Sequence, residues 1–173
     1  MEQVILVDEH DNAVGAMEKI EAHKKGLLHR AFSLLIFNSK NEMLLQKRAA
    51  SKYHSAGLWT NACCSHPRPK ETIIDAANRR AKEEMGIDCS PIHNFSFVYK
   101  VDLENDLMEH ELDHVLTAKY NGAININKEE VEDWKHVPLD ELIDDIDSNP
   151  DNYTFWFREI ITNPSFKKLT ETI

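Results

Sequence analysis

Some segments of the chain are continuously apolar or alternate apolar and polar residues, as strands do, and others repeat apolar residues every three or four positions, as helices do. The order of these segments predicts a mixed α/β protein. Residues 30–38 have the strongest strand pattern. A polar turn at 39–42 leads into a second apolar run at 43–48, and the two runs together predict a central β-hairpin. Other short apolar or alternating segments predict further strands at residues 4–7, 59–64, 95–101, 109–118 and 130–137.

Apolar residues that recur four apart predict a helix between Thr72 and Gly86. Thr72 and Asp75 resemble a capping box, and Gly86 stands where a helix-ending residue belongs. The apolar stripe of this helix consists of Ile73, Ala77, Ala81 and Met85.

A second helix is predicted to start at Pro138, with an apolar face of Leu139, Leu142, Ile143 and Ile146. A third helix would close over the core with Phe155, Trp156, Ile160 and Ile161. The chain after Pro164 is expected to be a short basic tail.

The composition fits a single globular domain that spans residues 1–173. The chain has 42% hydrophobic and 29% charged residues, which is ordinary for a globular protein with a substantial core. Lys and Arg total 20 against 30 Asp and Glu, and the resulting net charge of −10 argues against nucleic acid or an anionic membrane as a partner. An anionic small molecule would therefore need a local cluster of positive charge or a bound metal ion.

The cysteines and the first residues of the chain predict a cytoplasmic protein. The three cysteines, Cys63, Cys64 and Cys89, form a poor disulfide framework and fit a reducing compartment. The first ten residues lack the basic segment of a signal peptide, and no stretch has the length of a membrane span. We therefore expect no membrane association. We also expect a monomer or weak dimer.

The polar face of the helix that starts after Thr72 carries regularly spaced charges. Arg79 is followed four residues later by Glu83, and Arg80 by Glu84. Such pairs are common on solvated helix faces and contribute only roughly 0.3–0.5 kcal/mol each. On this interpretation the charges would have no role beyond solubility.

The exact order of these charges favours a functional role. Glu71, Arg79 and the segment 83–87 match the spacing of the Nudix box, Gly-x5-Glu-x7-Arg-Glu-U-x-Glu-Glu-x-Gly-U, in which U is an aliphatic residue. Two positions depart from that motif. Ser65 stands in place of the first Gly, and Arg80 stands in place of the Glu that follows the Arg.

A second motif, Asn61-Ala62-Cys63-Cys64-Ser65-His66-Pro67, precedes the helix. With the altered box, it resembles the type I isopentenyl-diphosphate:dimethylallyl-diphosphate isomerases, a branch of the Nudix superfamily. The resemblance extends over nearly the whole chain, from Val4 to Trp156. It implies the Nudix fold, an α/β (α+β) architecture in which helices sandwich a mixed β-sheet core. It also implies interconversion of isopentenyl and dimethylallyl diphosphate through a tertiary carbocation, a reaction of isoprenoid biosynthesis.

The resemblance assigns the acid and the base of this reaction. A double bond moves when one carbon is protonated and another loses a proton, so two acid/base groups must flank the substrate. The cysteine of the family motif maps to Cys64 and the catalytic carboxylate to Glu111, with Tyr99 as a hydrogen-bonding partner near Glu111. Cys63 would then be a small buried residue on the opposite face of its strand.

The resemblance also implies two metal ions. Glu109 and Glu111 share a face of their predicted strand, because they are two residues apart. The ligand set of the family maps onto these two carboxylates together with His23, His29 and His66. Imidazoles and carboxylates suit Mg²⁺, Mn²⁺ or Zn²⁺, so the ligand types alone do not select the ion. By the same resemblance, Glu84 joins a second ion, Mg²⁺, to the diphosphate.

The implied substrate is a small isoprenyl diphosphate with one charged and one apolar end. Guanidinium and ammonium groups bind phosphate oxygens, and the residues implied for this contact are Lys19, Arg48, Lys52 and Arg80. An aromatic wall at the apolar end would exclude water and present its π face to the cationic intermediate. Trp156 is implied in that role, with Trp59 lining the pocket.

Two other functions remain open from the sequence. A Nudix hydrolase of a nucleoside diphosphate derivative would share the fold, the Mg²⁺ and the anionic substrate. Arg80 argues against it, because a guanidinium stays protonated and cannot ligate a metal. A metal-binding regulatory or structural module would use the cysteines and histidines. Cys63, Cys64 and His66 lack the paired C-x2-C spacing of such sites, and the carboxylates suit harder ions.

Overall fold

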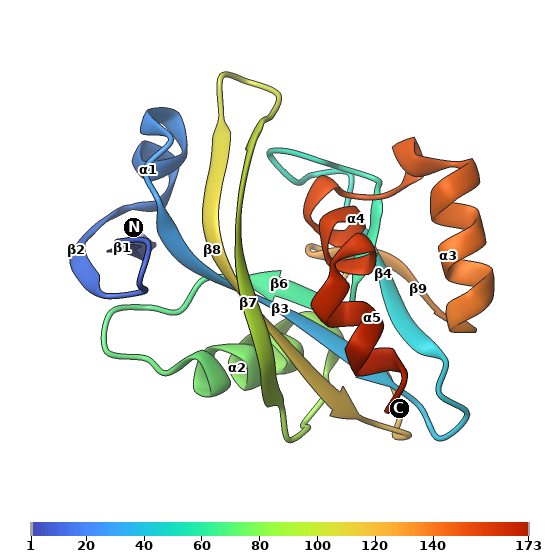
Figure 1. Ribbon diagram of the computed structural model, residues 1–173. Helices are drawn as coiled ribbons and strands as arrows, with labels where there is room; N and C mark the ends of the chain where they lie inside the picture. The colour runs from blue at the N-terminus through green and yellow to red at the C-terminus, as the bar shows by residue number, and fades with distance from the viewer. Residues whose placement is uncertain (1, 173) are drawn as a thin grey trace.

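The computed structural model describes residues 2–172, and one mixed sheet of nine strands runs through this part of the chain (Figure 1). The strands are β1 (Gln3–Val7), β2 (Ala13–Glu18), β3 (His29–Phe37), β4 (Met43–Arg48), β5 (Trp59–Asn61), β6 (Cys63–Ser65), β7 (Ile92–Asp102), β8 (Met108–Lys119) and β9 (Val131–Val137). The helices are α1 (Lys19–Lys25), α2 (Ile73–Met85), α3 (Leu139–Ser148), α4 (Phe155–Thr162) and α5 (Pro164–Thr170), with a short 3-10 helix at Pro150–Asn152. Within residues 2–172, no helix combines the length and the apolar character needed to cross a membrane.

Strand β3 lies at the centre of the part of the sheet that carries the predicted site. It pairs in parallel with β8, so that residues 29–37 lie beside residues 111–119. Residues 32–34 of β3 also pair antiparallel with β6. Beyond β8 the sheet ends in β7, while β4 pairs with β5 and β9. Strands β6 and β8 therefore flank β3 and carry the two predicted acid/base residues.

Helices cover both faces of the sheet (Figure 1). Helix α2 lies against one face, where Ala81 and Met85 are buried together with Leu116 of β8. Helices α4 and α5 cover the other face, where Phe157 and Phe166 are buried. The predicted α/β architecture, a mixed sheet between helices, is confirmed.

Helix α2 begins and ends where the sequence predicts. The Thr72 hydroxyl accepts a hydrogen bond from the backbone N–H of Asp75 at 3.1 Å, and Gly86 ends the helix in the left-handed region at φ 67°. A Cβ at Gly86 would lie 2.9 Å from the carbonyl oxygen of Asn125, so only glycine fits both the backbone conformation and the close approach. The last turn of α2 is thereby fixed against the loop that precedes β9.

Several features differ from the expected pattern. Strands β3 and β4 form the predicted antiparallel hairpin, but they pair only next to the turn, at Phe37 and Met43. Residues 13–25 form β2 and α1, where the sequence predicted neither a strand nor a helix. The chain after Pro164 is helix α5 rather than a tail. Ile143 is 37% exposed and lies outside the core face of α3.

Candidate active site

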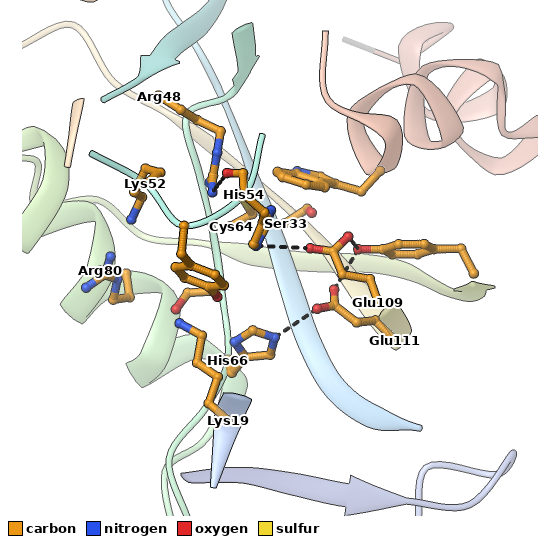
Figure 2. Close-up of a pocket in the computed structure, with 14 residues that line it drawn as sticks. Lys19, Ser33, Arg48, Lys52, His54, Cys64, His66, Arg80, Glu109 and Glu111 are labelled. Atoms are coloured by element: carbon orange, nitrogen blue, oxygen red, sulfur yellow. Dashed lines mark hydrogen bonds and ion pairs between the residues drawn. The ribbon is translucent and has the colours of Figure 1, made fainter. Parts of the chain in front are cut away.

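One cavity gathers most of the residues predicted from the sequence (Figure 2). It lies among β3, β6, β7, β8, α1, α2 and α4, and the loop after β4 contributes to its wall. The predicted residues that line it are Lys19, Arg48, Lys52, Cys64, His66, Arg80, Tyr99, Glu109, Glu111 and Trp156. Ser33, Tyr53 and His54 also line the cavity, although no sequence motif indicated them.

Cys64 and Glu111 approach the cavity from strands on either side of β3. Cys64 is the antiparallel partner of Ser33, and Glu111 is the parallel partner of His29. Because successive side chains of a strand alternate between faces, Cys63 points away from the cavity, and it is fully buried against α2. The arrangement gives the cavity a thiol on one wall and a carboxylate on another.

The surroundings of Cys64 keep its thiol protonated. Burial raises the pKa of the Cys64 thiol to about 12, with Arg48 opposing the shift and the neighbouring carboxylates adding to it. A thiol with such a pKa is neutral at pH 7 and is a proton donor rather than a nucleophilic thiolate. Cys64 therefore has the character of an acid.

Tyr99 links the two carboxyl groups of β8. Its hydroxyl lies 2.7 Å from Glu111 Oε2 and 3.0 Å from Glu109 Oε2. One hydroxyl proton can be donated to only one of these acceptors, so the pair needs a further proton or a cation. Burial, followed by the charge of Glu111, raises the pKa of Glu109 well above its usual value. Glu111 is therefore the carboxylate that remains ionised.

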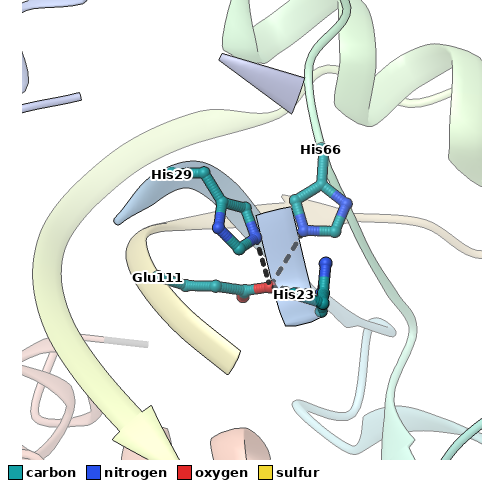
Figure 3. Close-up of side chains that lie close together, drawn as sticks. All are labelled: His23, His29, His66 and Glu111. Atoms are coloured by element: carbon teal, nitrogen blue, oxygen red, sulfur yellow. Dashed lines mark hydrogen bonds and ion pairs between the residues drawn. The ribbon is translucent and has the colours of Figure 1, made fainter. Parts of the chain in front are cut away.

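Within the described residues, three imidazoles converge on Glu111 (Figure 3). The distances from Glu111 Oε1 to their Nε2 atoms are 2.9 Å for His66, 3.4 Å for His29 and 3.9 Å for His23. The ligand atoms of these four buried residues lie within 4.8 Å of one another. They come from α1, β3, β8 and the segment after β6, so only the folded chain assembles them.

Backbone carbonyls set the tautomers of two of these imidazoles. His23 Nδ1 lies 2.7 Å from the carbonyl oxygen of Lys19, and His29 Nδ1 lies 2.8 Å from that of Leu27. A carbonyl oxygen only accepts, so each Nδ1 carries the proton and each Nε2 of a neutral ring presents a lone pair. Both Nε2 atoms are buried with no hydrogen-bond partner among residues 2–172. Lone pairs that face the Glu111 carboxylate repel it unless a cation lies between them, so these residues fit a divalent ion.

Burial also favours the neutral imidazoles that bind metal. It lowers the pKa of His23 and brings the pKa of His66 to about 4. Glu109, the other expected ligand, is not one of the four clustered residues. Glu109 is connected to Glu111 through the Tyr99 hydroxyl. The role of Glu109 as a metal ligand therefore stays a prediction.

Glu84 lies behind Arg80 rather than in the cavity wall. Its carboxylate is 2.7 Å from Arg80 Nη2 and accepts a hydrogen bond from Gln46 Nε2 at 2.8 Å. Burial is the largest single influence and by itself would lower the pKa of the Arg80 guanidinium, but the nearby acidic groups, Glu84 first among them and Glu130 as well, together raise that pKa. Glu84 is only 4% exposed, so the interpretation of these charges as a purely solvated helix face is wrong at this position. The expected bridge from Glu84 through Mg²⁺ to a diphosphate stays a prediction.

Glu130 is a part of the site that sequence reasoning missed. Its carboxylate pairs with Lys52 and lies 3.4 Å from Arg80 Nη2. It therefore holds two of the predicted diphosphate-binding side chains beside each other. Glu130 belongs to the acidic run at residues 129–133, and nothing in that run distinguishes it from its neighbours.

The two predicted tryptophans have different surroundings. Trp156 is 3% exposed and lines the cavity, with the guanidinium carbon of Arg48 5.3 Å from its ring centroid. Arg48 is held there by hydrogen bonds to the backbone carbonyls of His54 and Ser55. Trp59 is not part of the lining, because its ring packs against the core on the α4 side of the sheet, below the ammonium group of Lys135.

The chain is similar to known proteins over most of its length. The model of the NUDIX domain family matches residues 27–157. "Isopentenyl-diphosphate Delta-isomerase 2" from Aromatoleum aromaticum is 53% identical over 90% of this chain and 82% of its own length. The protein of the same name from Photorhabdus laumondii is 49% identical over 98% of this chain and 96% of its own length.

Solved structures show the same fold at lower identity. DR0079 from Deinococcus radiodurans has a TM-score of 0.70 at 18% identity, and covers 86% of this chain and 90% of that one. A MutT protein from Methanosarcina mazei has a TM-score of 0.66 at 18% identity, and covers 84% of this chain and 94% of that one. At this identity the likeness concerns the fold alone.

The imidazole cluster generates a first prediction. His66→Ala should weaken divalent-ion binding by at least about tenfold, because loss of even an outer-sphere partner typically costs that much and His66 is closest to Glu111. Titration with Mn²⁺ at pH 7, followed by electron paramagnetic resonance or calorimetry, measures the change. His10→Ala, in the exposed turn before β2, is the control and should bind Mn²⁺ as the wild type does. Equal affinities for His66→Ala and the wild type would rule out the cluster as the metal site.

Proposed function

The chain belongs to the isopentenyl-diphosphate Delta-isomerase family of NUDIX-domain proteins, and from this we propose that it interconverts isopentenyl and dimethylallyl diphosphate in isoprenoid biosynthesis. The observation that carries the proposal is the placement of Cys64 and Glu111 on strands either side of β3, at one cavity. The same cavity holds Lys52 and Arg80. A proton donor, a proton acceptor and an anion-binding end are thus combined in one site.

In the proposed cycle Cys64 is the acid and Glu111 is the base. The thiol gives its proton to C4 of the alkene, and C3 becomes a tertiary cation. The Glu111 carboxylate then removes a proton from C2, and the electron pair of that C–H bond forms the new double bond. Each turnover leaves a Cys64 thiolate and a protonated Glu111, so one proton must return to the thiol before the next turnover. The diphosphate remains intact throughout.

Tyr99 and the imidazole cluster support the base. The 2.7 Å hydrogen bond from the Tyr99 hydroxyl to Glu111 Oε2 orients the carboxylate. A divalent ion held by Glu111 and the three imidazoles would add positive charge beside the base and thereby tune its acidity. We propose Mn²⁺, Mg²⁺ or Zn²⁺ for this site, with Glu109 as a further ligand.

The opposite end of the cavity would bind the diphosphate. Lys19, Lys52 and Arg80 supply ammonium and guanidinium groups, which form charge-assisted hydrogen bonds to phosphate oxygens. Binding would exchange the contacts of Lys52 and Arg80 with Glu130 for contacts with the substrate. We propose Mg²⁺ as the ion that accompanies the diphosphate and Glu84 as its protein ligand, which requires Glu84 to give up a contact with Arg80.

Trp156 would protect the cationic intermediate at the apolar end. Its buried ring excludes water, which would otherwise capture the cation. A desolvated aromatic face also stabilises a nearby cation by about 2 kcal/mol or more. We further propose that the protein acts in the cytoplasm as a monomer or weak dimer, with a small-molecule diphosphate as its substrate.

Deuterium incorporation tests the proposed reaction directly. Isopentenyl diphosphate incubated with the protein and Mg²⁺ in D₂O should yield dimethylallyl diphosphate that carries deuterium, because the thiol proton exchanges with solvent before it reaches the substrate. Mass spectrometry and NMR identify the product and the labelled carbon. Glu111→Gln is the matched control and should give no product. Release of phosphate from nucleoside diphosphate derivatives without isomerisation would favour the hydrolase instead.

The two adjacent cysteines allow a paired test of the acid. Cys64→Ala should fold and bind the diphosphate but lose roughly 10²–10⁴-fold in kcat, since the proton donor is removed. Cys63→Ala shortens a side chain that lies on the other face of β6 and should retain most activity. Initial rates and thermal unfolding of both variants separate lost chemistry from lost stability. Near-normal turnover by Cys64→Ala with an inactive Cys63→Ala would place the acid one residue earlier.

Arg80 can be compared with its neighbour Arg79 in the same way. Arg80→Ala should lower kcat/KM about tenfold or more, because one charge-assisted contact to the diphosphate is worth roughly 1.5–3 kcal/mol. Arg79→Ala is the control, since Arg79 pairs with Glu71 at 2.7 Å and does not line the cavity. Steady-state rates for both variants measure the difference. Unchanged kcat/KM in Arg80→Ala would mean that Arg80 only pairs with Glu84 on the helix.

A further inference from the structure

A second pair of imidazoles lies on the other face of β8 from Glu111. His114 of β8 and His93 of the neighbouring strand β7 face each other, and their Nδ1 and Nε2 atoms, respectively, are 3.0 Å apart. Side chains alternate along β8, so His114 and Glu111 point to opposite faces of the sheet. This pair is therefore separate from the cavity and its imidazole cluster.

Asp11 determines which nitrogen of His114 carries the proton. Its Oδ2 atom lies 3.0 Å from His114 Nε2, and a carboxylate only accepts, so Nε2 donates. Asp11 is itself held by Arg30, which donates to Oδ1 and to the backbone carbonyl, both at 2.7 Å. Burial lowers the pKa of His114, with Asp11 opposing the shift, so the neutral ring is favoured. Neutral His114 therefore directs the lone pair of Nδ1 toward His93.

We propose that His93 Nε2 and His114 Nδ1 chelate a divalent transition ion, with Asp11 as the carboxylate behind His114. Carboxylate–histidine–metal chains of this kind are usual at metal sites, because the carboxylate fixes the tautomer and increases the basicity of the ligand nitrogen. The ion takes the place of the proton that His93 donates to His114. His93 then adopts its other tautomer, protonated at Nδ1, so the number of protons on the pair does not change.

The spacing of the two nitrogens favours a particular class of ion. With metal–nitrogen bonds of about 2.0–2.1 Å, a separation of 3.0 Å corresponds to an angle of roughly 95° at the metal. Such an angle suits neighbouring positions of a square-planar or octahedral ion, and imidazole ligands with this geometry are typical of Cu²⁺ and Ni²⁺. His93 is exposed, so water can fill the remaining positions.

Binding would also connect separate parts of the sheet. β8 lies between β7 and the β1–β2 region (Figure 1), and Asp11 belongs to the turn that joins β1 to β2. The hydrogen bonds that run from Arg30 through Asp11 and His114 to His93 therefore link four segments of the sequence. An ion bound only by the folded arrangement should raise the unfolding temperature.

Ni²⁺ titration of the whole protein tests this site, because Ni²⁺ does not oxidise the thiols. By calorimetry the wild type should bind one more Ni²⁺ per chain than His93→Ala, and Ni²⁺ should raise its unfolding temperature more. His136→Ala is the matched control, since His136 lies on β9 at the opposite edge of the sheet and should leave the stoichiometry unchanged. Equal stoichiometry in the wild type and His93→Ala would overturn the proposal, whatever ion the cavity binds.

A second variant tests the role of Asp11. Asp11→Asn should bind Ni²⁺ at this site about tenfold or more weakly, because loss of a carboxylate behind a ligand histidine typically has that effect. Circular dichroism of the metal-free variant confirms that the β1–β2 turn keeps its structure. Unchanged Ni²⁺ affinity in Asp11→Asn would show that Asp11 has no part in the site, which would then consist of the two imidazoles only.

Discussion

The parallel pairing of β3 with β8 is the constraint on which the candidate active site depends. It places His29 directly beside Glu111, while the antiparallel pairing of β3 with β6 places Cys64 beside Ser33. Because side chains alternate between the faces of a strand, a slip of one residue would turn Glu111 or Cys64 toward α2. Leu34 is buried against α2 and opposes such a slip, because a slip of β3 would turn Leu34 out of the core and toward the cavity. Backbone pairing therefore sets the geometry of the proposed acid and base.

Burial then determines which of these groups are charged. The same low-polarity surroundings that raise the pKa of Cys64 to about 12 raise that of Tyr99 well above its usual value, so both remain neutral donors. The imidazoles of His23 and His66 stay neutral for the same reason. Negative charge is concentrated on Glu111, beside nitrogen lone pairs that fit a cation. A carbocation that forms between Cys64 and Glu111 would be drawn toward the base that must deprotonate it.

The features that the sequence predicted are those with a local physical cause. The Thr72 cap, the Gly86 end of α2 and the separation of Cys63 from Cys64 all follow from residues close in the chain. The scattered imidazoles were indicated only by resemblance, because no local pattern relates α1 to the segment after β6. Glu130 was missed for the same reason, since its contact with Lys52 depends on where β9 and the loop after β4 meet. Long-range strand pairing decides such positions, and apolar periodicity does not encode it.

The arginine at the altered position of the Nudix box changes what α2 contributes. A glutamate there would add a ligand for metal ions that activate water near phosphorus. Arg80 instead pairs with Glu84, which Gln46 holds from the other side, and it also lies near Glu130. These carboxylates fix a permanent cation at the cavity. A fixed cation binds a diphosphate without promoting its hydrolysis, and that suits a reaction in which bonds change only at the alkene. In the proposed mechanism the chemistry therefore lies on β6 and β8 rather than on α2, which carries the Nudix box.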